Sequence, residues 1–440
     1  ENRTKEILQN DAPGGRTDGR GNYGSDPQIS PSKKRGRKRK VVVTNVHELR
    51  SAVLDDGVPL RDIELDMSQT PNGSEGNEIH MKGKQSDEIF SHEVLEIISK
   101  RAKTKSKPGK RAADDKAKLA LSIEGGGMRG AVSAGMVGAI ACLGLCDCFD
   151  EIYGSSAGSI VGAYMISRQM CIDVYTDVLT TANKEFLCKN RMISSLVRTF
   201  VGSVISSDFS EGEKSKSSRR SLPGLNISFI LDGIMCPDYG IRPLDFESFK
   251  ANDAKQPLRV VTSVVKDGKM DVVCLGSKEK DFFDDIDDNG MVTSFASTSA
   301  DGTNHGLFAC LEASMKVPAA TGPPVSLIRN MDMAANKRSE CFDAFCYEPI
   351  PYRSAVEEGA THVLVLRTRP EGSTLRTKPT IYESLLAPNY FKSHRLPQVA
   401  DFFKSGGQQY IYLEDILALN EGKGVSSSEE NKRGIRVPPP

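Results

Sequence analysis

Hydrophobic residues are concentrated in the middle of the chain, where strand-like and helix-like segments alternate. From residue 119 onward, a short apolar run is followed by a glycine-rich turn and then by a longer segment of small and apolar residues, and the order is then repeated. This repeated order of strand, turn and helix predicts parallel strands joined by helical crossovers. Residues 363–366 form another fully apolar run, which predicts a strand of the same sheet that is buried on both faces. We therefore expect an α/β fold with a mainly parallel central sheet.

The same pattern predicts several further elements. A helix is expected near residues 91–102, where apolar positions follow helical spacing. Residues 257–275 read as two strands joined by an Asp267-Gly268 turn, which is a strong signal for a hairpin. The longest uncharged run, residues 130–146, is rich in Gly and Ala, so we expect a buried core helix there and not a membrane-spanning one.

Composition divides the chain into one domain with polar flanks. Residues 1–117 are polar and basic, so we expect them to be largely disordered apart from that helix. The hydrophobic pattern assigns residues 118–419 to one domain, which is interrupted by polar insertions near 207–222 and 277–306. Residues 420–440 form a polar tail, which we expect to be flexible.

Overall charge and cysteine content exclude few classes of function. The chain holds 58 Lys and Arg residues and 58 Asp and Glu residues, so its net charge favours no class of partner. Its ten cysteines do not form a secreted disulfide framework in a chain this long, and no secretory signal is visible at the start. We expect an intracellular protein, in the cytoplasm or in an organelle such as a plastid, that associates peripherally with membranes. Because residue 1 is Glu, we also expect the native N-terminus to lie outside this sequence.

Two segments before the predicted domain are strongly basic, residues 33–40 and residues 100–118. The first fits a solvated linker, a nuclear signal, a contact with the DNA minor groove or a contact with anionic lipid. The second fits either an acidic membrane surface or an exposed connector. We expect the protein to contact an anionic membrane surface peripherally, and we expect no nucleic-acid partner.

Two glycine-rich turns lie close together near the start of the predicted domain. The second has the Gly-x-Ser-x-Gly form of a nucleophile elbow between a strand and a helix, which is the context that this motif requires. There we expect Ser156 to be the nucleophile, with its hydroxyl held clear of the sheet. In the first turn, backbone N–H groups gather at a helix N-terminus and form a candidate oxyanion hole. The elbow residues around Ser156 are Gly154, Ser155, Ala157 and Gly158, and the residues of the first turn are Gly125, Gly126, Gly127, Met128, Arg129 and Gly130.

The first turn also fits a dinucleotide-binding fingerprint, Gly-x-Gly-x-x-Gly between a strand and a helix. That fingerprint needs an acidic residue at the end of the next strand to bind a ribose hydroxyl. Asp147 and Asp150 come before that strand, whose end carries Gly154 and Ser156 instead. A nucleotide-binding oxidoreductase is therefore an alternative only if the serine turn is a coincidence.

The two turns in this order, residues 124–130 and residues 154–158, resemble the patatin-like phospholipase family. The resemblance covers roughly residues 118–368, with insertions, and implies a three-layer α/β/α hydrolase fold. It extends to the block ahead of the family's catalytic aspartate and to the segment that leads into the last apolar strand. These parts contain Glu312, Ala313, Ser314, Pro318, Pro323, Pro324 and Val325, then Pro349, Pro351, Glu358, Gly359 and Ala360.

Members of this family use a serine and an aspartate without histidine, so the resemblance implies that Asp343 is the base for Ser156. It also implies cleavage of fatty-acyl ester bonds of glycerolipids, either phospholipids or galactolipids, through an acyl-enzyme, with no metal and no organic cofactor. Asp343 is followed by Ala344 and Phe345, where the family has Gly-Gly or Gly-Ala. Alanine strains this turn if the backbone needs a positive φ. Two alternatives follow, a catalytically impaired lipid-binding homologue and the use of Asp301, in an Asp-Gly dipeptide, as the base.

Overall fold

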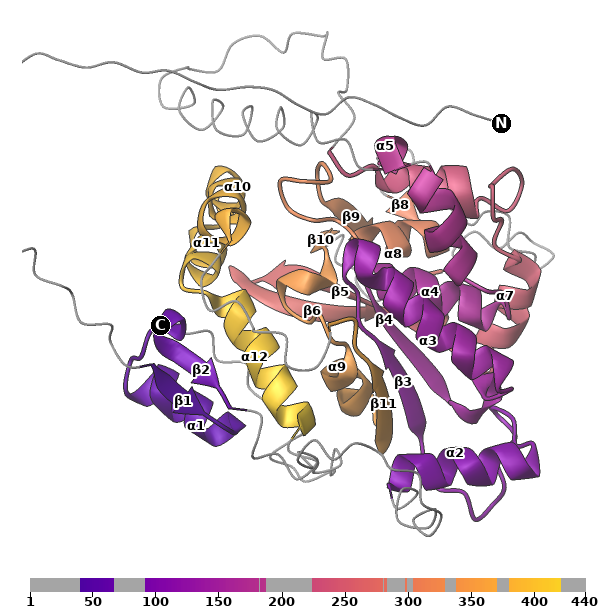
Figure 1. Cartoon of the computed structure of the whole chain (residues 1–440). Helices are drawn as coiled ribbons and strands as arrows, with labels where there is room; N and C mark the ends of the chain where they lie inside the picture. The colour runs from indigo at the N-terminus through magenta and orange to yellow at the C-terminus, as the bar shows by residue number, and fades with distance from the viewer. Residues whose placement is uncertain are drawn as a thin grey trace, which may run out of the picture. The chain divides into compact units, whose positions relative to one another are not determined.

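The fold is described from a computed structural model of the 440-residue chain (Figure 1). The predicted insertion 207–222 and the tail after residue 420 lie outside the described residues, as do residues 1–39 and most of the insertion 277–306. The residues that the structure describes are 40–66, 92–181, 183–186, 224–279, 281–282, 297–298, 304–328, 338–369 and 380–420.

A seven-stranded sheet forms the centre of the fold. The strand order is β11, β3, β4, β5, β10, β9, and β6 also pairs with β5. β11, β3, β4 and β5 are parallel neighbours, whereas β6, β9 and β10 pair antiparallel. The predicted α/β fold with a mainly parallel sheet is confirmed, and antiparallel strands are added at one side. The strands are β3 Leu119–Ile123, β4 Glu151–Ser155, β5 Leu258–Lys266, β6 Lys269–Leu275, β9 Val325–Ile328, β10 Arg338–Phe342 and β11 His362–Leu366.

Helices and short strands surround this sheet. The helices are α1 Val46–Arg50, α2 Glu93–Thr104, α3 Gly130–Cys142, α4 Ala157–Ile166, α5 Asn183–Phe186, α7 Phe246–Asp253, α8 Gly306–Ser314, α9 Tyr352–Glu357, α10 Ala387–Ser393, α11 Pro397–Lys404 and α12 Gly407–Asn420. The short strands are β1 Val41–Val43, β2 Ile63–Leu65, β7 Ser297–Thr298 and β8 Asn304–His305.

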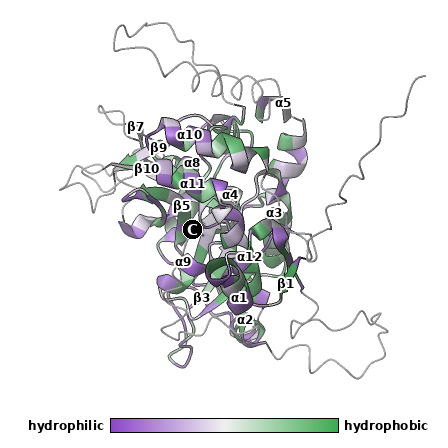
Figure 2. Cartoon of the chain, turned by 90° about the vertical axis from the view of Figure 1, so that its left-hand side faces the viewer, coloured by the Kyte–Doolittle hydropathy of each residue, from purple (hydrophilic) through white to green (hydrophobic). Residues whose placement is uncertain are grey.

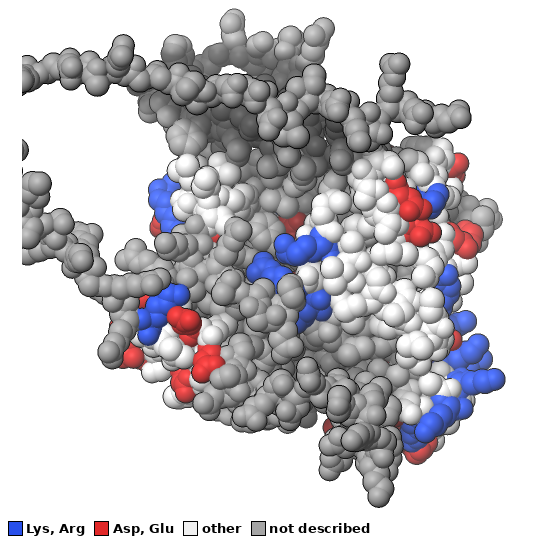
Figure 3. All heavy atoms as spheres, in the orientation of Figure 1, with Lys and Arg blue, Asp and Glu red and all other residues white. Residues whose placement is uncertain are grey.

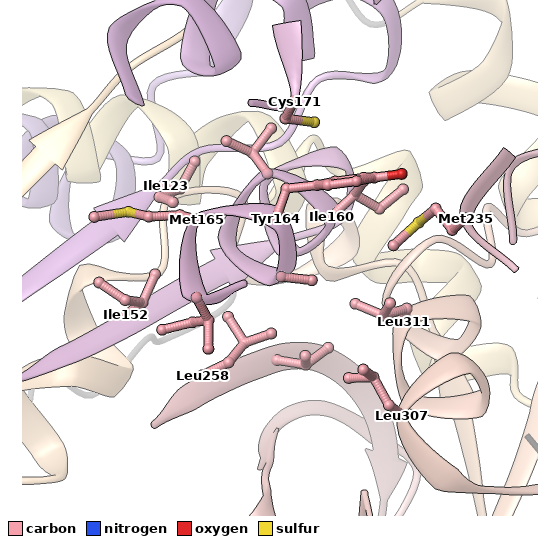
Figure 4. Packing of buried hydrophobic residues seen from close by; sticks show 14 of the residues in the cluster. Ile123, Ile152, Ile160, Tyr164, Met165, Cys171, Met235, Leu258, Leu307 and Leu311 are labelled. Carbon is pink, nitrogen blue, oxygen red and sulfur yellow. The ribbon is translucent and has the colours of Figure 1, made fainter. Parts of the chain in front are cut away.

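Side chains alternate between two faces along the parallel strands, and helices cover both faces. Leu119, Leu121 and Ile123 of β3 belong to the largest buried cluster, together with residues of α3, α4 and α8. Ala120 of β3 and Tyr153 of β4 belong to a separate cluster with a residue of α9. Figure 1 shows α3 and α4 on one side of these strands and α9 and α12 on the other, and Figure 4 shows the largest cluster around α4. The sheet therefore lies between two helical layers.

β5 and β6 form the predicted hairpin. Their antiparallel pairing extends to Lys266 and Lys269 at the turn. Asp267 and Gly268 have φ angles of 51° and 76°, which is the left-handed pair that a tight two-residue hairpin turn requires. The prediction for residues 257–275 is confirmed.

Two predictions about burial need correction. Among the described strands β11 pairs only with β3 and forms the edge of the sheet, so residues 362–365 are half-buried and not buried on both faces. Helix α3 buries only one side, and its Val132 is 48% exposed. Figure 2 shows this helix mostly in green and white. Because it has no polar face, the sequence could not show which side is exposed. In the parts of the chain that the structure describes, no helix combines the length and the hydropathy needed to cross a membrane.

Folded segments precede residue 118, where the sequence predicted mainly disorder. β1 and β2 pair in parallel, and α1 follows β1. Val43, Leu49 and Ile63 of this part are buried in a cluster with residues of α10, α11 and α12. These apolar side chains pack against the opposite end of the chain, which local composition cannot reveal. The predicted helix near 91–102 is confirmed as α2, whereas the domain boundary at residue 118 stays a prediction.

Arg101, on α2, is 1% exposed and ties this helix to the residues that precede β3 and β4. Its guanidinium donates hydrogen bonds to the carboxylates of Asp115 and Asp150, both at 2.8 Å, and to the Cys148 carbonyl at 2.7 Å. Arg111 also donates to Asp150, at 2.7 Å. These two arginines of the basic run are therefore part of the folded interior and are not available to a membrane.

We expect Arg101→Met to lower the free energy of unfolding by about 1–3 kcal/mol, because Asp115 loses its guanidinium partner and the carbonyl of Cys148 loses a buried donor, whereas Asp150 keeps Arg111. The matched control is Lys103→Met on the exposed side of the same helix, which should change the free energy of unfolding by less than about 0.5 kcal/mol. Urea unfolding followed by circular dichroism measures both variants. If the free energy of unfolding changed by less than about 0.5 kcal/mol in both variants, Arg101 would not be required for the fold.

Candidate active site

Ser156 lies at a sharp turn between β4 and α4. Its φ and ψ angles are 51° and −123°, a backbone conformation that residues other than glycine rarely adopt. Gly158 permits this bend, because a Cβ at its position would lie 2.2 Å from the carbonyl oxygen of Ile123. Ser156 is 9% exposed and lines a cavity. The strained turn therefore presents the serine to this cavity.

The first glycine turn packs directly on the Ser156 turn. A Cβ on Gly125 would lie 2.4 Å from the carbonyl oxygen of Ser155 and 2.9 Å from the Cβ of Ser156, so only glycine fits there. Gly126 and Gly127 have φ angles of 147° and 57°. Their N–H groups donate no hydrogen bond to any other described residue, and free N–H groups beside a serine can stabilise an oxyanion.

The structure brings the two predicted turns together at the ends of neighbouring parallel strands. The residues of both turns are placed as follows: Gly154 and Ser155 end β4, Ala157 and Gly158 begin α4, Gly125 and Gly126 follow β3, Gly127, Met128 and Arg129 form a short 3-10 helix, and Gly130 begins α3.

Asp343 lies directly after β10 and reaches Ser156. The Ser156 hydroxyl donates to Oδ2 of Asp343 at 2.9 Å, and the Phe345 N–H donates to Oδ1 at 2.9 Å. Burial raises the pKa of Asp343 to about 7, although both hydrogen bonds act in the opposite direction. A carboxylate with a pKa near 7 is suited to accept a proton from a serine at neutral pH.

Ala344 replaces the glycine that the resemblance leads us to expect, and the backbone accommodates it without strain. It begins the 3-10 helix Ala344–Cys346 and is not among the residues with a positive φ. Its side chain is buried in the cluster that holds Ala120 and Tyr153. The backbone at Ala344 therefore gives no reason to expect an impaired base. Asp301, the alternative base, lies outside the described residues.

The end of α8 holds the serine and the aspartate by their backbone N–H groups. The Ser314 hydroxyl accepts a hydrogen bond from the N–H of Ser156 at 2.8 Å and donates one to the carbonyl of Val261 at 2.6 Å. Two residues later, the Lys316 carbonyl accepts a hydrogen bond from the N–H of Asp343 at 2.8 Å. One short segment thus sets the spacing of the two side chains. Because the Ser156 N–H is used in this way, it is not free to hold an oxyanion.

A cavity of about 310 Å³ opens beside Ser156. Much of its wall is apolar and comes from α4, from residues on either side of the 187–223 segment and from the residue after α8, among them Ile160, Leu179, Phe186, Ile230 and Met315. Such a wall suits a hydrocarbon chain. The described lining contains no histidine. Over the described residues as a whole, no group of three or more His, Cys, Asp or Glu side chains could hold a metal ion.

The sequence did not single out a group of polar residues at the cavity, formed by Glu124, Arg369 and their partners. The buried carboxylate of Glu124 accepts hydrogen bonds from the N–H of Thr368 and from the hydroxyl of Tyr412. Arg369 lines the cavity and stacks on the Tyr412 ring, with Cζ 4.1 Å from the ring centroid. The order of the strands could have indicated part of this polar group. β3 and β11 are parallel neighbours, so the residues after their ends had to meet at one edge of the sheet, where ligands of α/β folds bind.

A comparison with protein families agrees with this geometry. The chain matches the family model described as patatin-like phospholipase over residues 121–356, more than half of its length. The matched region includes both glycine turns, Ser314 and Asp343. A search of curated proteins found no match. The family model implies hydrolase activity on lipid acyl esters. The chain therefore belongs to the patatin-like phospholipase family.

Proposed function

We propose that the protein is a serine lipid acyl hydrolase that cleaves fatty-acyl ester bonds of glycerolipids with a Ser156–Asp343 pair. The observation that carries this proposal is the 2.9 Å hydrogen bond from the Ser156 hydroxyl to the buried Asp343 carboxylate, beside a cavity with largely apolar walls. The family match supports lipid acyl hydrolase activity in general. The roles of Ser156 and Asp343 and the glycerolipid substrate are proposed here.

The reaction proceeds in two half-reactions through an acyl-enzyme. Ser156 attacks the ester carbonyl carbon while Asp343 accepts its proton, and the N–H groups of Gly126 and Gly127 stabilise the tetrahedral oxyanion. The C–O bond to glycerol then breaks, and Asp343 returns the proton to the leaving oxygen. Water deprotonated by Asp343 attacks the acyl-enzyme, which releases the fatty acid and restores the Ser156 hydroxyl. The scheme requires no metal and no organic cofactor.

The alternative functions receive less support. A dinucleotide would have to approach the first turn where Gly125 packs against Ser155 and Ser156, and the family match favours a hydrolase. An impaired homologue was suggested by Ala344, but this residue has no positive φ, and the hydrogen bond between Ser156 and Asp343 is in place.

Covalent labelling tests the proposed function. A fluorophosphonate lipid analogue should phosphonylate the full chain at Ser156, and peptide mass spectrometry should locate the adduct there. The rate of hydrolysis of a short-chain p-nitrophenyl ester should fall in proportion to the fraction of protein that is labelled. Ester turnover that persists after complete labelling would assign the chemistry to another group, and a protein with neither labelling nor turnover would contradict the proposal.

We also propose that the protein works at an anionic membrane surface. Met128, in the first turn, is 45% exposed, and Val132, one turn further on, is 48% exposed. Lys103 and Lys105 are exposed at the end of α2, whereas residues 33–39 of the basic block lie outside the described residues. Attraction to anionic lipid contributes about 1 kcal/mol per cation and weakens with salt. Co-sedimentation with anionic vesicles at low and high salt tests this, and equal binding to neutral vesicles would contradict it.

We expect Ser314→Ala to lower kcat for a soluble ester by about 10–100-fold with little change in KM, because the Ser156 turn loses the hydrogen bond that positions it. The matched control is Ser122→Ala. Ser122 is equally buried in β3, and its hydroxyl has no hydrogen-bond partner among the described residues, so kcat should stay within about twofold. Full activity of both variants would show that the Ser314 hydroxyl does not position Ser156.

A further inference from the structure

The cavity beside Ser156 has two guanidinium groups in its lining, those of Arg129 and Arg369. Neither guanidinium forms an ion pair or a hydrogen bond with another described residue. The acidic residues of the lining are Glu124 and Asp343, and both carboxylates already accept two hydrogen bonds. Figure 3 shows Lys and Arg atoms grouped at the middle of the face, beside the largely uncharged surface over α3. Cationic groups that pair with no other described residue, in a mainly apolar cavity, point to an anionic ligand.

Arg369 is held by stacking, which leaves the edge of its guanidinium group available. Its Cζ lies 4.1 Å from the centroid of the Tyr412 ring. The ring is itself fixed, because the Tyr412 hydroxyl donates to Glu124 at 3.1 Å. A guanidinium that rests on an aromatic face keeps its N–H donors directed outward in its own plane, where they can bind two oxygens of a phosphate.

Hydrogen bonds also tie Arg369 to the first glycine turn. The preceding residue, Thr368, donates its N–H to Glu124 and its hydroxyl to the Gly125 carbonyl, the latter at 3.0 Å. Gly125 in turn packs against Ser156. The position of Arg369 relative to the serine is therefore set by buried contacts and not by a free loop.

We propose that Arg369, with Arg129 beside the same cavity, binds the phosphate of a glycerophospholipid headgroup and determines specificity for phospholipids over galactolipids. The inference rests on the proposed acyl hydrolase function and adds the headgroup class to it. The phosphate of a glycerophospholipid is close along the glycerol to the ester, so an ester placed at Ser156 brings the phosphate to the lining around it. A galactolipid offers uncharged hydroxyl groups there, and hydrogen bonds between a guanidinium and a phosphate are roughly twice as strong as neutral ones.

Arg369→Gln tests the inference on two monomeric substrates, dihexanoylphosphatidylglycerol and galactosyl dihexanoylglycerol. We expect kcat/KM for the phospholipid to fall by about 10–100-fold, as for the loss of a charged hydrogen-bonded contact, and kcat/KM for the galactolipid to change by less than about twofold. Arg369→Lys, which keeps the charge and loses the planar fork, should recover part of the loss. The matched control is Arg367→Gln, which removes a nearby cation that is not in the described lining and should leave the preference unchanged.

A binding measurement separates this inference from the proposed reaction. Diether analogues of the two lipids contain no ester, and calorimetry on the full chain should show a preference of about 10-fold or more for the phospholipid ether, lost in Arg369→Gln. If the full chain shows this binding preference but hydrolyses neither ester, the headgroup site is supported and only the proposed reaction is contradicted. Equal losses for both lipids, or an unchanged phospholipid preference in Arg369→Gln, would overturn the inference. Inorganic phosphate that bound at Arg369 more tightly than the phospholipid ether would also overturn it, because the site would then belong to free phosphate.

Discussion

Ser156→Ala is expected to abolish ester hydrolysis, with kcat lowered by about 10⁴-fold or more, while the protein stays folded. Alanine has no hydroxyl group and therefore cannot form the acyl-enzyme. The fold should tolerate the change, since the Ser314 hydroxyl binds the backbone N–H of Ser156 and not its side chain. Turnover of a soluble p-nitrophenyl ester and thermal unfolding by circular dichroism measure the two effects.

Ser155→Ala is the matched control, because it removes a hydroxyl from the adjacent residue of the same turn. Ser155 is fully buried, and its hydroxyl donates to the Glu348 carbonyl at 2.9 Å. Its loss should cost about 1 kcal/mol of stability and leave kcat within about threefold. An inactive Ser155 variant beside an active Ser156 variant would identify Ser155 as the nucleophile and refute the proposed role of Ser156.

The sequence revealed those parts of the site that depend on local backbone geometry. A glycine-rich turn between a strand and a helix can be recognised within a few residues, which is why Ser156 and the first turn could be named. Asp343 depended on resemblance, because an aspartate that follows a short strand has no local sequence signature. The same limit left the choice between Asp343 and Asp301 open. The structure places Asp343 2.9 Å from the Ser156 hydroxyl, whereas Asp301 lies outside the described residues.

The residues that support the site could not be predicted, because their partners are distant in the sequence. Tyr412 on α12 meets Glu124 through a separation of 288 residues, and no periodicity connects them. Ser314 was noticed in the sequence, but nothing indicated that its hydroxyl binds the N–H of Ser156. The folded segment 40–66 was missed for the same reason, since Leu49 is buried in a cluster that includes residues of the C-terminal helices.

Asp343→Asn is expected to lower kcat by about 10²–10⁴-fold, because an amide cannot accept the proton of Ser156. The local structure should survive, since the amide oxygen can accept the Phe345 N–H and the amide NH₂ can donate to the serine. In the wild type, kcat should rise as the pH increases through about 7, the pKa of Asp343, because only the ionised carboxylate acts as a base. Kinetics of both proteins between pH 5 and pH 9 should show this rise in the wild type and not in the variant.

The raised pKa of Asp343 also predicts that the asparagine variant gains stability relative to the wild type as the pH increases. Burial holds the pKa of Asp343 at about 7 in the folded chain, above its ordinary value of 3.8, so the folded state binds the proton more tightly than the unfolded state. The resulting stabilisation is complete below about pH 4 and is lost as the pH rises through about 7. Asparagine does not titrate, so the free energy of unfolding of the variant relative to wild type should increase from pH 5 to pH 8. The increase should be on the order of 2–3 kcal/mol, since each pKa unit corresponds to about 1.4 kcal/mol. Urea unfolding of both proteins at these two pH values measures it. A difference that stays constant would mean that Asp343 titrates near its ordinary value, which would leave it a weak base for Ser156.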